Sequence, residues 1–97
     1  MKAVFVVYNM ALTDKVEYMI DSLNIWGYSQ WSNMQGRGTN TGDPHYGNHT
    51  WPEINSAILC IVEEEKVEKL LQKVKNLDHV NQDVGIRAFV WDITGGY

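Results

Sequence analysis

The residues with the clearest chemical potential lie in one stretch, Gln35 to Pro52, which contains Asp43, His45 and His49. Neutral imidazole and carboxylate groups form a workable ligand set for zinc, copper or nickel. Their spacing is not that of a helix and so defines no geometry, and packing of both histidines against nearby aromatic side chains is the alternative. The three residues are therefore a candidate site for a divalent metal.

The start of the same stretch has the composition of an anion-binding segment. Arg37 stands between Gly36 and Gly38, and Gly42 follows shortly after. Glycines let a ligand approach the backbone closely, and a guanidinium can bind phosphate or carboxylate with two parallel hydrogen bonds. Since loops as long as 35–52 are uncommon in small domains and are usually functional or disordered, we expect this one to be functional.

Composition and charge exclude several classes of protein. The net charge of −4 argues against a nucleic-acid binder, and the longest apolar runs are too short to cross a membrane. The sequence carries no hydrolase triad order, P-loop or dinucleotide fingerprint, so we name no catalytic residue and do not expect an enzyme. Cys60 lies within an apolar run and is expected to be a buried structural thiol, which suits a cytoplasmic protein.

The elements that must position the loop begin with a strand, Ala3 to Tyr8, which is apolar on both faces. Apolar residues then recur at helical spacing from Asp14 to Leu23, with Thr13 or Asp14 as the N-cap. The mixed stretch from Trp26 to Met34 predicts a second strand.

After the loop, Ser56 to Val62 predicts a strand, and a helix opens at Glu63 with acidic residues at the positive end of its dipole. The polar segment from Asn76 to Gly85, which includes His79 as a surface residue, is interpreted as a loop. Alternation from Ile86 to Ile93 predicts the last strand. Its residues Phe89, Trp91 and Ile93 should share one face.

This order of elements predicts an α+β fold, a single ferredoxin-like βαββαβ domain over residues 1–97. Its four-stranded antiparallel sheet should have the first and third strands in the middle, with both helices on one face. The other face would present either Ala3, Phe5 and Val7 or Val4, Val6 and Tyr8. That is too much apolar surface to leave in water, so we expect another subunit to cover it.

The glycine-rich segment resembles the P-II family of nitrogen regulatory signalling proteins. Members of that family follow the second strand with Gly-x-Gly-x-Gln-x-Gly, and Gly36, Gly38 and Gly42 match the glycines while Asn40 stands at the glutamine. The resemblance implies a homotrimer with an adenine nucleotide in the clefts between subunits. It also implies that the loop responds to the ligand and contacts a target protein.

The family's second glycine-rich turn, which follows its second helix, corresponds to Asn76–Gly85 and retains one glycine, Gly85. Arg87 stands in for the lysine that follows this turn in the family. The segment from Gly42 to Trp51 is shorter than the family's target-contacting loop and carries His45 and His49. The resemblance thus adds Asn40 and Arg87 to the ligand-binding candidates and describes a divergent member.

Three functions remain open. The leading hypothesis is a regulatory protein that senses an adenine nucleotide or another small anion at subunit clefts and signals through loop 35–52 to a partner, a transporter or an enzyme. The second is a metal sensor or buffer that uses His45 and His49. The third is a small oxygenase-type enzyme, which rests on fold analogy alone.

Overall fold

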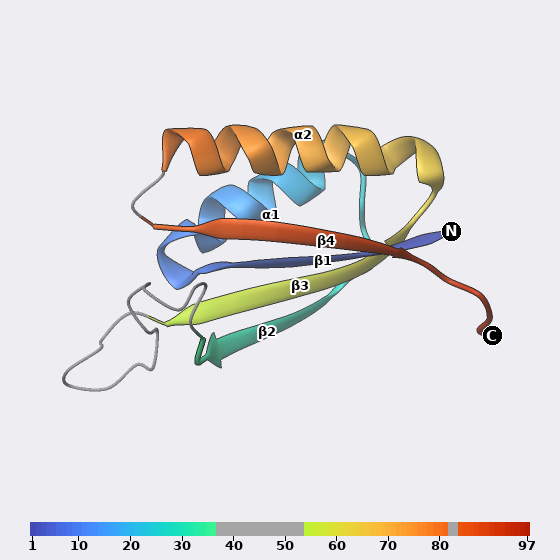
Figure 1. Ribbon diagram of the computed structural model, residues 1–97, viewed down its shortest axis with the longest axis horizontal. Coiled ribbons are helices and arrows are strands. Elements are labelled where there is room, and N and C mark those ends of the chain that lie inside the picture. Colours follow the sequence, from blue (N-terminus) through green and yellow to red (C-terminus); the bar gives the residue numbers. More distant parts are fainter. Residues whose placement is uncertain (37–53, 82–83) are drawn as a thin grey trace.

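The computed structural model describes residues 1–36, 54–81 and 84–97, which form two layers (Figure 1). One layer is a four-stranded antiparallel sheet, and the other is a pair of helices that covers one face of it. The elements in chain order are β1 (Lys2–Asn9), the 3-10 helix η1 (Met10–Leu12), α1 (Thr13–Ser22), β2 (Ser29–Met34), β3 (Asn55–Val62), α2 (Glu64–Val80) and β4 (Ile86–Asp92).

The strands lie in the order β2-β3-β1-β4, and every neighbouring pair is antiparallel. The two strands with continuous apolar runs, β1 and β3, are therefore the central ones, where both neighbours protect their backbone groups. This arrangement confirms the predicted α+β, ferredoxin-like fold and the predicted places of the first and third strands.

The core lies between the sheet and the helices. Alternate residues of β1, Val4, Val6 and Tyr8, point into it because successive side chains of a strand leave opposite faces. The helices and the other strands complete the cluster with Leu12, Val16, Met19, Ile20, Ile58, Cys60, Val62, Leu70, Val74 and Ile86. As predicted, Cys60 is buried, and its removal from water raises the pKa of the thiol.

The opposite face of the sheet carries Phe5 and Val7, which settles the alternative that the sequence left open. Strand register places further apolar side chains beside them: Trp31, Ala57, Leu59, Ile61, Phe89 and Trp91. Phe89 remains 56% exposed and Trp91 48% exposed. We call this surface the open face, and the helices leave it uncovered (Figure 1).

The ends of three elements differ from the prediction. Neither Thr13 nor Asp14 caps α1; instead Asn9 caps the preceding η1, its Oδ1 accepting from the backbone N–H of Ala11 at 2.9 Å. The second strand begins at Ser29 rather than Trp26, whose side chain is 73% exposed. The last strand ends at Asp92, so Ile93 lies just beyond it.

The second helix is longer than predicted and continues to Val80, so the predicted loop from Asn76 is wrong for its first residues. The extra turn ends at Asn81, whose backbone N–H and Nδ2 both donate to the Leu77 carbonyl, at 3.0 and 2.9 Å. These bonds satisfy a carbonyl group that the end of a helix leaves without an internal partner. In the described part of the chain, no helix is long and apolar enough to span a bilayer.

Candidate functional site

A pocket of about 280 Å³ lies at the end of the open face from which segment 37–53 departs. Two of the predicted ligand-binding residues, Gly36 and Arg87, line it although they are 51 positions apart in the sequence. The remaining lining residues are Val7, Met34, Gln35, Asn55 and Phe89. The pocket thus combines an apolar base with two amide side chains and one guanidinium, a composition typical of small-molecule sites.

Backbone hydrogen bonds hold the four chain segments around this pocket. The N–H of Asn9 donates to the Gly85 carbonyl at 3.1 Å, and the N–H of Met10 donates to the Ile54 carbonyl at 2.8 Å. The end of β1 is thereby fixed both to the approach to β4 and to the start of β3. Gly85 has a φ of 93°, a conformation that a side chain would strain, which explains the glycine at this turn.

Gly36 is required for a different reason. Its φ lies outside the left-handed region, but a Cβ atom at this position would come within 2.8 Å of the Asn55 Nδ2 atom. The absence of a side chain therefore lets the Asn55 amide sit directly against the backbone where the loop begins. Sequence reasoning selected Gly36 correctly as a place of close approach, but it missed Asn55, the group that approaches.

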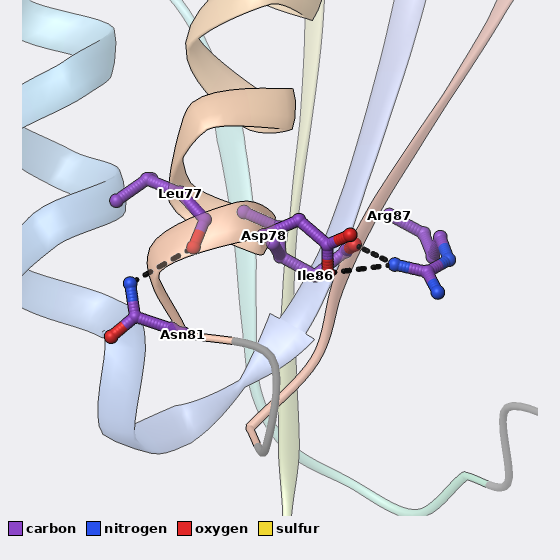
Figure 2. Close-up of polar contacts among 5 residues, drawn as sticks. All are labelled: Leu77, Asp78, Asn81, Ile86 and Arg87. Carbon is purple, nitrogen blue, oxygen red and sulfur yellow. Dashed lines mark hydrogen bonds and ion pairs between the residues drawn. The ribbon is translucent and has the colours of Figure 1, made fainter.

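Arg87 lies on β4 opposite Val7, and its side chain is 65% exposed. Figure 2 shows its guanidinium with Nη1 donating to Asp78 Oδ1 at 2.8 Å and to the Ile86 carbonyl at 2.7 Å. Both bonds use one nitrogen of a group that has five N–H donors. A cation is therefore present at the pocket, as the sequence predicted for Arg87.

The other predicted site residues lie outside the described residues: Arg37, Gly38, Asn40, Gly42, Asp43, His45 and His49. The metal site and the oxygenase-type hypothesis depend on these histidines and stay predictions. Within residues 1–36, 54–81 and 84–97, no group of three or more metal-ligating side chains is placed to hold a metal ion. His79 is exposed, as predicted.

A larger groove, of about 530 Å³, lies between α1 and α2 and is lined in part by Tyr18, Leu77 and Val80. It contains none of the residues that the sequence selected, and Tyr18 and Val80 are simply exposed there, at 77% and 76%. We therefore assign the candidate site to the smaller pocket, where charge, amides and apolar surface converge.

Comparison with known proteins agrees with this choice of fold and site. Residues 1–95 match the family model described as nitrogen regulatory protein P-II. A comparison with curated proteins finds no match.

Solved structures provide relatives at low sequence identity. One is CPII from Thiomonas intermedia K12 bound to ADP, AMP and acetate, with a TM-score of 0.76 and 21% identity over 99% of this chain and 88% of that one. The same protein bound to ADP and bicarbonate gives 0.73 and 23%, covering 95% and 84%. A putative PII-like signaling protein from Thermus thermophilus gives 0.65 and 21%, covering 93% and 83%.

Proposed function

The chain belongs to the nitrogen regulatory protein P-II family, and on this premise we propose that it is a homotrimeric sensor of an adenine nucleotide and a small anion. The observation that carries the proposal is the pocket shared by Gly36 and Arg87. Gly36 begins the loop, and Arg87 supplies positive charge in a chain whose net charge is −4. CPII structures that contain ADP, AMP, acetate or bicarbonate give the ligand class.

The size of the pocket supports a site shared between subunits. Its 280 Å³ lies just below the range of about 300–1,000 Å³ that is usual for small-molecule sites, so one chain offers room for only part of a nucleotide. Val7 and Phe89 belong both to the pocket and to the open face. A second subunit on the open face would therefore border the pocket and could complete it.

The open face itself supports self-association. Its partly exposed aromatic residues, Trp31, Phe89 and Trp91, are residue types enriched at protein interfaces. Contiguous apolar surface on a soluble chain of this size usually marks an interaction site. Three copies related by a threefold axis bury the same face of each chain without leaving an open end.

The proposed site connects directly to the loop through which the protein would signal. Gly36 is both a wall of the pocket and the residue before segment 37–53. A ligand in contact with Gly36 would restrict the first residues of the loop, and so would change how loop 35–52 meets a target protein such as a transporter or an enzyme.

Calorimetric titration tests the site. ADP and bicarbonate are titrated, separately and together, into wild type and Arg87→Ala. Loss of a charge-assisted hydrogen bond should cost about 1.5–3 kcal/mol, roughly one to two decades of affinity. Lys69→Ala removes an equal charge from the exposed side of α2 and is the control. Equal affinities in a folded, trimeric Arg87→Ala protein would contradict the assignment.

Limited trypsin digestion tests the connection to the loop. Arg37 is the one lysine or arginine between Gln35 and Pro52, so cleavage within the loop reports on that position alone. We expect ADP to slow this cleavage in wild type and not in Arg87→Ala. An unchanged rate at a concentration of ADP that saturates the calorimetric site would show that the loop does not sense the ligand.

A further inference from the structure

An ion pair joins the last turn of α2 to β4 beside the proposed site. Asp78, three positions before Asn81, accepts from Arg87 Nη1 at 2.8 Å (Figure 2). The Asp78 side chain is 37% exposed and that of Arg87 is 65% exposed, so water has access to both groups. An ion pair in this setting contributes little to stability and can be exchanged for another partner.

The pair reaches around the edge of the sheet. Register places Arg87 with Val7 on the open face, whereas Asp78 belongs to a helix that covers the opposite face. Because β4 is an edge strand, no further strand separates the two groups. The Arg87 side chain therefore lines the pocket while its Nη1 is occupied by a carboxylate from the helix layer.

We propose that Asp78 is a built-in competitor, an internal carboxylate that holds Arg87 until a phosphate or bicarbonate ligand displaces it. This inference rests on the proposed function, because it requires Arg87 to meet the anion. The exchange replaces one anion by another at the same guanidinium, and a phosphate group can form two parallel bonds with it. Asp78 thereby sets the ligand concentration at which the site fills.

Displacement also has a structural consequence at the helix end. With Asp78 released, the last turn of α2 loses its ionic attachment to β4 next to the pocket. Asn81 keeps that turn closed, since it binds the Leu77 carbonyl twice and its own carbonyl accepts from the Val84 N–H at 3.0 Å. The turn is thus released from the sheet without unwinding.

The same contacts indicate that a variant without the carboxylate will fold. Asp78 lies in the last turn of α2, at the negative end of the helix dipole, where a negative charge is unfavourable. Asp78→Asn removes that charge and leaves both Asn81 bonds in place. Its stability to urea should therefore match that of wild type.

The decisive experiment is calorimetric titration of ADP into wild type, Asp78→Asn, Arg87→Ala and the double variant. We expect Asp78→Asn to bind ADP about two- to fivefold more tightly, the range that corresponds to an exposed ion pair. The gain should vanish in the Arg87→Ala background, because the competition then has no object. Glu68→Gln, an exposed acid on α2 ten positions earlier, is the matched control and should leave the affinity unchanged.

The outcomes separate the two proposals. If Arg87→Ala weakens ADP binding while Asp78→Asn does not strengthen it, Asp78 is no competitor and the proposed site stands. If Arg87→Ala has no effect, or if neither wild type nor Asp78→Asn binds ADP, the proposed site and the competition both fail. An equal gain in Glu68→Gln would reduce the effect to net charge and overturn the role of Asp78.

Discussion

The Phe5 and Trp31 rings meet edge to face on the open face, with centroids 6.5 Å apart and planes inclined by 61°. They belong to β1 and β2, which are separated by β3, so the rings meet across an intervening strand. Ala57 of β3 lies opposite Trp31 in the register and is fully buried, because its small side chain fits beneath this contact. The open face is therefore already packed on its β2 side before any partner is present.

The first prediction concerns assembly through that face. Phe89→Glu places a charge on a side chain that is 56% exposed in the single chain, so the fold should persist while a buried interface should not. Light scattering after size-exclusion chromatography should change from trimer to monomer. Tyr18→Glu, at a helix side chain 77% exposed, should remain trimeric. A trimeric Phe89→Glu protein would show that the open face is not the interface.

The second prediction concerns the contact between Gly36 and Asn55. Gly36→Ala introduces a Cβ atom at 2.8 Å from Asn55 Nδ2, and the amide must move because it is the free end of a side chain. The melting temperature should change little, whereas affinity for ADP should fall severalfold. Gly27→Ala, where a Cβ meets nothing within 4 Å, should alter neither. Unchanged affinity in Gly36→Ala would remove Asn55 from the site.

The third prediction concerns pH and Tyr8. Burial raises the pKa of the Tyr8 phenol, although the Gln30 amide that donates to its oxygen at 3.0 Å acts in the opposite direction. An unfolded tyrosine ionises near pH 10, so the free energy of unfolding should fall as the pH rises from about 10 towards the folded pKa.

Tyr8→Phe removes both the hydrogen bond and the ionisation. It should cost about 0.5–1.5 kcal/mol at pH 7, and this difference from wild type should shrink above pH 10. Urea denaturation at pH 7 and at pH 10.5 measures both effects, with Tyr18→Phe at an exposed side chain as the control. A difference that grows with pH would contradict the predicted sign.

The fourth prediction uses two adjacent leucines of α2. Leu70 is fully buried and Leu71 is 36% exposed, although the sequence assigned both to the buried stripe. Leu70→Ala should lower the free energy of unfolding by about 2–5 kcal/mol, since it leaves a cavity. Leu71→Ala should cost clearly less in the same urea titration. Equal losses would mean that the helix is rotated about its axis from this position.

The sequence predicted the fold because its two most apolar strands, β1 and β3, have a single arrangement that protects them both. It predicted element ends less well where tertiary contacts decide them. Leu77 and Val80 continue the helical spacing past the polar residue Asn76, and that continuation was the available signal for the last turn of α2. The start of β2 was misplaced because Ile25, which joins the core, was not recognised as the anchor of the connection before it.

The candidate site was predicted in part for a similar reason. Gly36 and Arg87 were selected from residue type and family resemblance, and the structure places them around one pocket. Asn55 and Asp78 could not be selected, because their importance comes from what lies opposite them in space. Asp78 in particular looked like one more solvated charge on α2.

The register of β2 against β3 is regular from Ser29 to Trp31 and then shifts before Met34, where Asn33 adopts a φ of 60°. Such an irregularity disturbs the even row of amide and carbonyl groups that an edge strand otherwise offers to passing chains. The edge that leads towards the loop is therefore a poor template for further strands. A small protein with so much uncovered apolar sheet gains from it a defence against the endless edge-to-edge growth of amyloid.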